Sequence, residues 1–206
     1  MPQEKQQEIL DAVSAEMQRE PVETRRLRLR LFREEDFPDF AAYILQKEQQ
    51  RLAGNPEIDT TAQARELFDW VLHPKRAPRT FAILLKEEGR AVGNFSLGAS
   101  PYLEEEPRLA ELRGLSFSLV LNQDYWNRGL MTELLRAALD WTFTHTDLDY
   151  VNTGCFSFNG ASRRVQEKAG LRLFARSVFE RDGKRIPTEE RVLFREDWEA
   201  KNENRT

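Results

Sequence analysis

Hydrophobic and polar positions repeat along the chain with two different periods, and the shorter period predicts strands. Arginine and leucine alternate over residues 26–31, so we expect the leucines to face a core and the arginines to face solvent. Two apolar runs at 80–85 and 91–98 are separated by a charged turn, which predicts a hairpin. Further strands are expected at 115–121, 150–156, 171–180 and 190–195.

The longer period, of three to four residues, predicts helices. The expected helices cover about residues 3–19, 61–72, 129–144 and 159–169, and one more begins near residue 37 and ends at the glycine-proline break 54–56. The first of these segments carries a narrow apolar stripe, so the sequence leaves open whether it is a docked helix or a frayed extension. Trp70 and Trp141 are both predicted to pack in the core.

The order of these elements predicts a mixed α/β domain with a long antiparallel meander in its middle. The chain has 206 residues, 40% of them apolar and 13 of them Phe, which is enough for one domain with a substantial core. We expect an N-terminal helical extension at 1–21, one domain at 22–198 and a polar tail at 199–206.

Composition narrows the classes of function. A formal net charge of -4 argues against a nucleic-acid binder, which would normally carry a basic stripe. One cysteine, Cys155, and two histidines predict neither a disulfide nor a metal site, and Cys155 is expected to be a small buried hydrophobe. The opening residues do not resemble a secretory signal and no apolar run is long enough to span a membrane, so we expect a cytoplasmic protein without a membrane partner.

The junction between the strand at 115–121 and the helix near 129 is the first candidate for chemistry. The start of a helix leaves backbone N–H groups unpaired, and the helix dipole favours an anion there. Gly129 would allow a phosphate to approach the backbone, Arg128 adds a positive charge and Thr132 adds a hydroxyl. One glycine before a helix is equally compatible with an ordinary loop.

Residues 125–133 read Tyr-Trp-Asn-Arg-Gly-Leu-Met-Thr-Glu, which resembles the acetyl-CoA pyrophosphate loop of the GNAT superfamily. The similarity is greatest to the RimJ/RimL-like branch, the ribosomal-protein N-acetyltransferases. The loop positions that match this branch are Tyr125, Trp126, Arg128, Gly129, Thr132 and Glu133. A second match, to the pattern Asn-x-x-Ser-x-x-x-x-Glu-Lys-x-Gly, consists of Asn159, Ser162, Val165, Glu167, Lys168 and Gly170. With the Arg/Leu strand and Trp198, the resemblance covers about residues 22–198.

This resemblance implies the GNAT fold, a mostly antiparallel sheet of about seven strands with about four helices. It implies transfer of an acetyl group from acetyl-CoA to a primary amine, either a peptide N-terminal α-amine or a small-molecule amine, by direct attack in a ternary complex without a metal. A homodimer, common in this branch, is an open alternative to a monomer. The residues implied in acetyl-CoA binding are Leu119, Val120, Leu121, Trp126, Asn127, Arg128, Gly129, Leu130, Met131, Thr132, Asn159 and Ser162.

The reaction needs a base for the amine, donors for the oxyanion and an acid for the leaving thiolate. By analogy with the fold, a backbone N–H near residues 119–121 is expected to face the oxyanion. By alignment with the branch, Ser162 is the candidate acid, although it could equally stabilise the first turn of its helix. Glu180 and Glu190, which flank the last hairpin, are the candidate bases, with the acidic run 104–106 as an alternative.

The chain also departs from the branch. Asn127 replaces the usual glycine of the loop, Met131 replaces an alanine, and Gln166 stands where many relatives have a tyrosine acid. A catalytically degenerate acyl-CoA-binding sensor or interaction module is therefore the alternative to an active enzyme. Outside the site, Glu133 is interpreted as favourable charge in the first helical turn, and His145 as the end of its helix.

Overall fold

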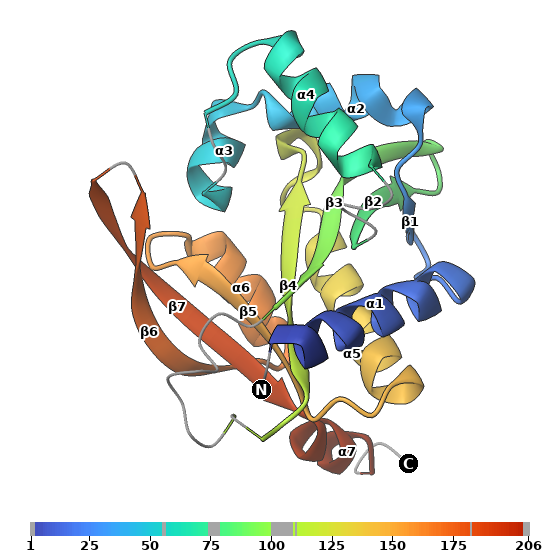
Figure 1. The fold of residues 1–206 in the computed structure, drawn as a ribbon, viewed down its shortest axis with the longest axis vertical. Helices are drawn as coiled ribbons and strands as arrows, with labels where there is room; N and C mark the ends of the chain where they lie inside the picture. Colours follow the sequence, from blue (N-terminus) through green and yellow to red (C-terminus); the bar gives the residue numbers. More distant parts are fainter. Residues whose placement is uncertain are drawn as a thin grey trace.

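The computed structural model describes residues 3–54, 57–73, 79–99, 109, 111–181 and 183–203. Seven strands form one mixed sheet, with helices on both of its faces (Figure 1). The strands are β1 Leu27–Leu31, β2 Thr80–Leu85, β3 Arg90–Gly98, β4 Gly114–Leu121, β5 Tyr150–Phe156, β6 Arg172–Arg181 and β7 Lys184–Phe194. The α-helices are α1 Gln3–Arg19, α2 Phe37–Ile44, α3 Lys47–Ala53, α4 Thr61–Leu72, α5 Leu130–His145, α6 Gly160–Ala169 and α7 Arg195–Glu203.

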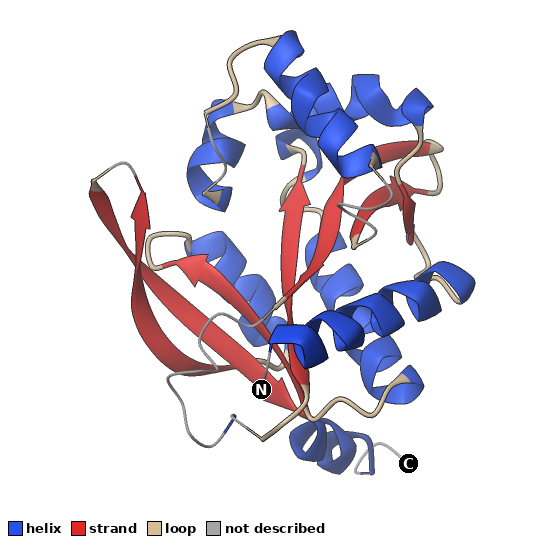
Figure 2. Ribbon diagram, in the orientation of Figure 1, coloured by secondary structure: helices blue, strands red, loops and turns tan. Residues whose placement is uncertain are grey.

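The sheet consists of two antiparallel parts that meet at a single parallel pair, in the order β1-β2-β3-β4-β5-β7-β6. Strands β4 and β5 pair only where Gly114–Ser116 lie beside Tyr150–Asn152. Beyond these residues both strands continue without pairing to each other, so the sheet opens at the carboxyl half of β4 (Figure 2). This opening exposes backbone groups of β4 that a continuous sheet would have used in its ladder.

Helices cover the two faces of the sheet with separate apolar cores. On one face, α1 and α5 pack against the sheet through side chains such as Met17 and Leu134. On the other face, α2 and α4 pack through Phe40 and Phe68, whose rings are 5.0 Å apart between centroids. The fold class and the mostly antiparallel seven-stranded sheet are as predicted.

The N-terminal segment is a docked helix. Along α1 the side chains of Ile9, Leu10, Val13 and Met17 are all at most 6% exposed and belong to the same core as α5. The indole of Trp141, which is buried as predicted, donates a hydrogen bond from Nε1 to the backbone oxygen of Glu20 at 2.8 Å. The sequence left open whether this segment is a docked helix or a frayed extension, and tertiary packing makes it a docked helix.

Several local predictions need correction. Residues 37–53 form two helices, α2 and α3, because the chain leaves the helical conformation at Gln46. Trp70 is 45% exposed rather than buried, since it lies two residues from Phe68 and therefore off the buried face of α4.

In β1, Leu27 and Leu29 are buried as predicted, but the last residue, Leu31, is 36% exposed. Arg30 is not fully solvated, because its guanidinium lies 2.6 Å from the buried carboxylate of Asp36. At the other end of the chain, α7 continues past residue 198 to Glu203.

Among the described residues, no helix is long and apolar enough to cross a membrane.

Candidate active site

A cavity of about 780 Å³ lies where β4 and β5 diverge. Its walls come from β4, β5, the start of α5, α6, α3 and the β6–β7 hairpin. Every residue that the sequence assigned to acetyl-CoA lines it: Leu119, Val120, Leu121, Trp126, Asn127, Arg128, Gly129, Leu130, Met131, Thr132, Asn159 and Ser162. The two motifs, about thirty residues apart in the sequence, thus face one space.

The loop that enters α5 has two residues in the left-handed region of backbone conformation. Gly129, the N-cap of α5, has φ +74°, and Asn127 has φ +61°. Asn127 is the one non-glycine residue with positive φ in the described parts of the chain. Asparagine tolerates this conformation better than other non-glycine residues, which explains how it can replace the usual glycine. The residues that begin α5, Leu130, Met131 and Thr132, line the cavity directly after this turn.

Glu133 connects this helix start to the segment just before β1. Its carboxylate accepts hydrogen bonds from the Thr24 hydroxyl at 2.6 Å and from Arg26 Nε at 2.7 Å, and Arg26 Nη1 also donates to the Arg128 carbonyl oxygen at 3.0 Å. Burial disfavours the charged carboxylate, but these hydrogen bonds outweigh it and lower the pKa of Glu133. Glu133 therefore does more than complement the helix dipole, because it positions the whole turn by tertiary contacts.

Two aromatic residues shape the mouth of the cavity beside this loop. The Trp126 indole donates from Nε1 to the Leu121 carbonyl oxygen at 2.9 Å, which ties the loop to the end of β4. The Arg128 guanidinium lies 4.9 Å from the centroid of the Tyr125 ring and is exposed. A positive charge is thus held at the rim, where an anionic ligand would arrive.

Glu190, on β7, brings a carboxyl to the cavity. It is 7% exposed, and burial raises the pKa of Glu190 to about 7, although a hydrogen bond from Asn152 Nδ2 at 3.1 Å acts in the other direction. The space for this carboxyl depends on Gly154, because a Cβ at that position would lie 2.0 Å from Glu190 Oε1. Sequence reasoning missed Gly154, yet a glycine inside a strand is a signal of close approach.

Asn159 and Ser162 lie at the start of α6. Asn159 is the N-cap, since its Oδ1 accepts from the Ser162 backbone N–H at 3.0 Å, and its Nδ2 donates to the Leu52 carbonyl oxygen at 3.2 Å. The Ser162 hydroxyl accepts from Gln166 Nε2 at 3.1 Å, so its own proton can be donated elsewhere.

Cys155 also lines the cavity and is only partly buried. Burial raises the pKa of its thiol, which disfavours a nucleophilic thiolate.

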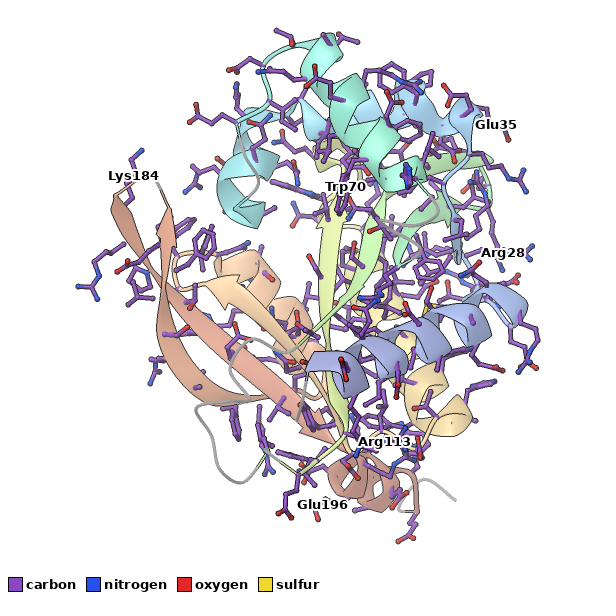
Figure 3. The ribbon with its side chains drawn as sticks, viewed as in Figure 1. Arg28, Glu35, Trp70, Arg113, Lys184 and Glu196 are labelled. Carbon is purple, nitrogen blue, oxygen red and sulfur yellow. The ribbon has the colours of Figure 1, made fainter. Side chains whose placement is uncertain are left out.

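The structure does not bring the other candidate base to this site. Glu180 lies near the tip of the β6–β7 hairpin, where its carboxylate is 69% exposed and 3.0 Å from Arg185 Nε. Figure 3 shows Lys184 at this tip, away from the body of the molecule. The acidic run 104–106 lies outside the described residues. His145 ends α5 as predicted, with Nδ1 2.8 Å from the Trp141 carbonyl oxygen.

Several lining residues had no motif to indicate them. They come from α3, from β5 and from the last hairpin, and include Gln49, Leu52, Thr153, Phe156, Phe179 and Thr188. Among the described residues, no three His, Cys, Asp or Glu side chains gather in a way that could hold a metal ion.

Residues 26–172 match the sequence family described as an acetyltransferase (GNAT) domain. Since this match spans more than half of the chain, the protein belongs to the GNAT acetyltransferases, and it is an acetyl-CoA-dependent acyltransferase. The cavity fits that co-substrate, because it joins a helix start suited to phosphates with an open strand edge suited to the pantetheine amides.

Solved structures with the same fold include a GNAT-family acetyltransferase from Bacillus anthracis, with a TM-score of 0.72 and 18% identity over 85% of this chain and 99% of that one. A spermidine N-acetyltransferase from Vibrio cholerae in complex with CoA and spermine has a TM-score of 0.65 and 16% identity, over 85% of this chain and 99% of that one. A ribosomal-protein-S5-alanine acetyltransferase from Vibrio fischeri has a TM-score of 0.64 and 15% identity, over 86% of this chain and 98% of that one. No curated protein sequence matches the chain. The resemblance to the ribosomal-protein branch is thus supported at the level of the fold.

Proposed function

We propose that this protein acetylates a primary amine by direct attack on acetyl-CoA within a ternary complex, with Glu190 as the general base. The observation that carries the proposal is the single cavity shared by the start of α5, the open edge of β4 and the Glu190 carboxyl. One wall suits the phosphates and pantetheine of the donor, and Glu190 offers a proton acceptor. Holding the amine and the thioester together in this space would supply a large part of the rate enhancement.

Glu190 has the properties that a base for this reaction requires. An ammonium must lose a proton before it can attack, and a base works best when its pKa lies near the working pH. The pKa of Glu190, raised to about 7 by burial, meets this condition, whereas an exposed glutamate would be too weak a base. Asn152 donates to Oε2 at 3.1 Å and so orients the carboxyl.

The oxyanion and the leaving thiolate would meet groups on β4 and α6. Backbone N–H groups near Leu119–Leu121 lie on the part of β4 that has left β5, so they can donate to the thioester oxygen. Ser162 is the candidate acid for the thiolate, because it lines the cavity and its hydroxyl, which accepts from Gln166 Nε2, carries a proton that it can donate. Gln166, which replaces the usual tyrosine, would then act through Ser162.

The acceptor is proposed only as a class, a primary amine on a peptide N-terminus or on a small molecule. Spermidine and ribosomal-protein acetyltransferases share the fold, and so the fold favours neither class. Release of the CoA thiol, followed with a panel of amines and acetyl-CoA, tests the proposal directly. Turnover with at least one primary amine supports it.

The alternative, a degenerate module that binds acyl-CoA without turnover, makes a different prediction in the same assay. It requires tight binding of CoA and no thiol release above the rate of hydrolysis with any amine. Failure to bind CoA at all would contradict both proposals.

A further inference from the structure

Gln49, on α3, is a buried amide that lines the cavity without an internal partner. Its side chain is 2% exposed, and neither Nε2 nor Oε1 has a hydrogen-bond partner among the described residues. The next residue, Gln50, is 3% exposed but fully used, because its Nε2 donates to the carbonyl oxygens of Ile44 at 2.8 Å and Ile58 at 2.7 Å. Gln50 therefore holds the chain around α3 together, whereas Gln49 makes no such contact.

A buried amide without partners lowers stability, since it has lost its hydrogen bonds to water. Buried polar side chains in folded proteins nearly always have a partner, and one that lines a binding cavity can find its partner in a ligand. Because both the donor and the acceptor of Gln49 are unpaired, its complement is a group with an N–H and a C=O together. A carboxamide is the simplest such group.

The register of the strands places Gln49 on the side of the acceptor. A Cβ on Gly54, which caps α3, would lie 2.6 Å from the ring of Phe156, so α3 covers the face of β5 to which Phe156 points. Gly154 is two residues earlier and points to the same face, and Glu190 lies directly opposite Gly154. Gln49 and the Glu190 carboxyl thus line the cavity from one face of the sheet. Helices α5 and α6, which pack on each other, carry the expected CoA motifs on the other face.

The charges of the lining also select the acceptor. Among the described residues of the cavity, the cations Arg128, Arg164 and Lys168 belong to the α5 loop and α6, and Glu190 is the one carboxyl. An acceptor with several ammonium groups would find a single acidic partner here. An acceptor with one amine and a neutral amide would use both Glu190 and Gln49.

Building on the proposed function, we propose that Gln49 is a specificity-determining residue that binds a carboxamide of the acceptor, next to the amine that is acetylated. The proposal is tested with two amines of similar shape, alaninamide and 3-methyl-2-butylamine, in which an isopropyl group replaces the carboxamide. The measured quantity is the ratio of their kcat/KM values in the wild type and in Gln49→Met. Comparing the ratio between variants removes the effect of the different basicity of the two amines.

We expect the ratio of kcat/KM for alaninamide to kcat/KM for the alkyl amine to fall about 10- to 100-fold in Gln49→Met. In that variant the carboxamide of alaninamide would be buried without a hydrogen-bond partner. Since Gln49 makes no internal hydrogen bond among the described residues, the variant should melt at the same or a higher temperature. Gln50→Met is the matched control, which should melt at a lower temperature with an unchanged ratio, because its bonds are internal.

An unchanged ratio in Gln49→Met would overturn the proposal. If the affinity for CoA also fell, Gln49 would instead contact the pantetheine of the donor. Binding offers an independent measurement that needs no turnover. Alaninamide should raise the melting temperature of the wild-type complex with CoA and should fail to do so in Gln49→Met. If alaninamide stabilised the wild type and Gln49→Met equally, the role of Gln49 would be overturned. Absence of thiol release with every amine would contradict only the proposed function.

Discussion

The Glu190 carboxyl is buried in surroundings that favour its neutral form. Its pKa is raised from 4.5 to about 7 by burial, which the hydrogen bond from Asn152 opposes only partly. Since the folded-state pKa is the higher one, this group stabilises the fold fully below pH 4.5, and the stabilisation is lost as the pH rises through about 7. A shift of this size corresponds to a loss on the order of 3 kcal/mol. The same ionisation that makes Glu190 a base therefore weakens the folded state.

Glu190→Gln separates these two effects. We expect kcat/KM to fall by about 100-fold or more, and its rise with pH around 7 to disappear, because the variant has no proton acceptor. The free energy of unfolding should exceed that of the wild type at pH 8, where the wild type has a buried charge, and the excess should shrink toward pH 5. Rate profiles and urea unfolding at both pH values measure this. An equal loss of activity in Glu180→Gln, at the hairpin, would argue against Glu190 as the base.

Ser162→Ala tests the candidate acid. We expect kcat to fall about 10- to 100-fold, since the thiolate would leave without a proton, while the Kd for CoA stays close to that of the wild type. Stopped-flow turnover and equilibrium binding give the two values. If kcat is unchanged, Ser162 only stabilises the start of α6, where Asn159 already accepts its backbone N–H.

At the scale of elements, the turn between β4 and α5 combines two left-handed residues with contacts from the segment just before β1. Gly129 lines the cavity with φ +74°, and a Cβ at this position would lie 3.7 Å from Arg26 Nη2. Arg26, Thr24 and Glu133 hold the turn from outside, so it is preorganised before any ligand binds. Preorganised N–H groups bind an anion without a further ordering cost.

Gly129→Trp should therefore abolish binding of acetyl-CoA, because it strains the backbone of this turn and adds a large side chain at a residue that lines the cavity. Isothermal titration with CoA measures the loss. Gly89→Trp is the matched control, as Gly89 has a similar φ of +69° but sits in the β2–β3 turn with open space around it. We expect Gly89→Trp to lower stability and to keep CoA affinity. Normal affinity in Gly129→Trp would rule out the phosphate site.

At the scale of the whole molecule, α1 is part of the domain core rather than an appendage. Met17 is 1% exposed and shares its core with Leu134 of α5. Apolar side chains buried to this extent contribute about 1.5–3 kcal/mol each. The helix joins the first residues of the chain to the element that forms the candidate phosphate site.

We expect Met17→Ala to lower the free energy of unfolding by about 2–5 kcal/mol. Because α1 shares the core, the whole unfolding transition should move to lower urea concentration as one step. Glu8→Ala, on the exposed side of the same helix, should change stability little. A separate early transition in Met17→Ala would show instead that α1 unfolds on its own.

Local patterns in the sequence determined much of the architecture. The apolar periods predicted β2, β5 and α4 with the bounds that the structure has, because each of these elements keeps one period between clear breaks. The residues that the resemblance implied in acetyl-CoA binding, such as Gly129 and Asn159, all line the cavity. Asn159 and Gly170 mark α6 because capping depends on neighbouring backbone alone.

Tertiary structure decided what depends on segments far apart in the chain. Glu190, Gly154 and Gln49 come from three different elements, and no local spacing relates them. The raised pKa of Glu190 follows from burial, which only the assembled fold defines. The docking of α1 and the exposure of Trp70 have the same origin, since hydrophobic burial is a property of packed surfaces. The sequence by itself thus determined the elements and the donor motifs, and only the packing of the sheet and helices brought the candidate base and Gln49 to face them.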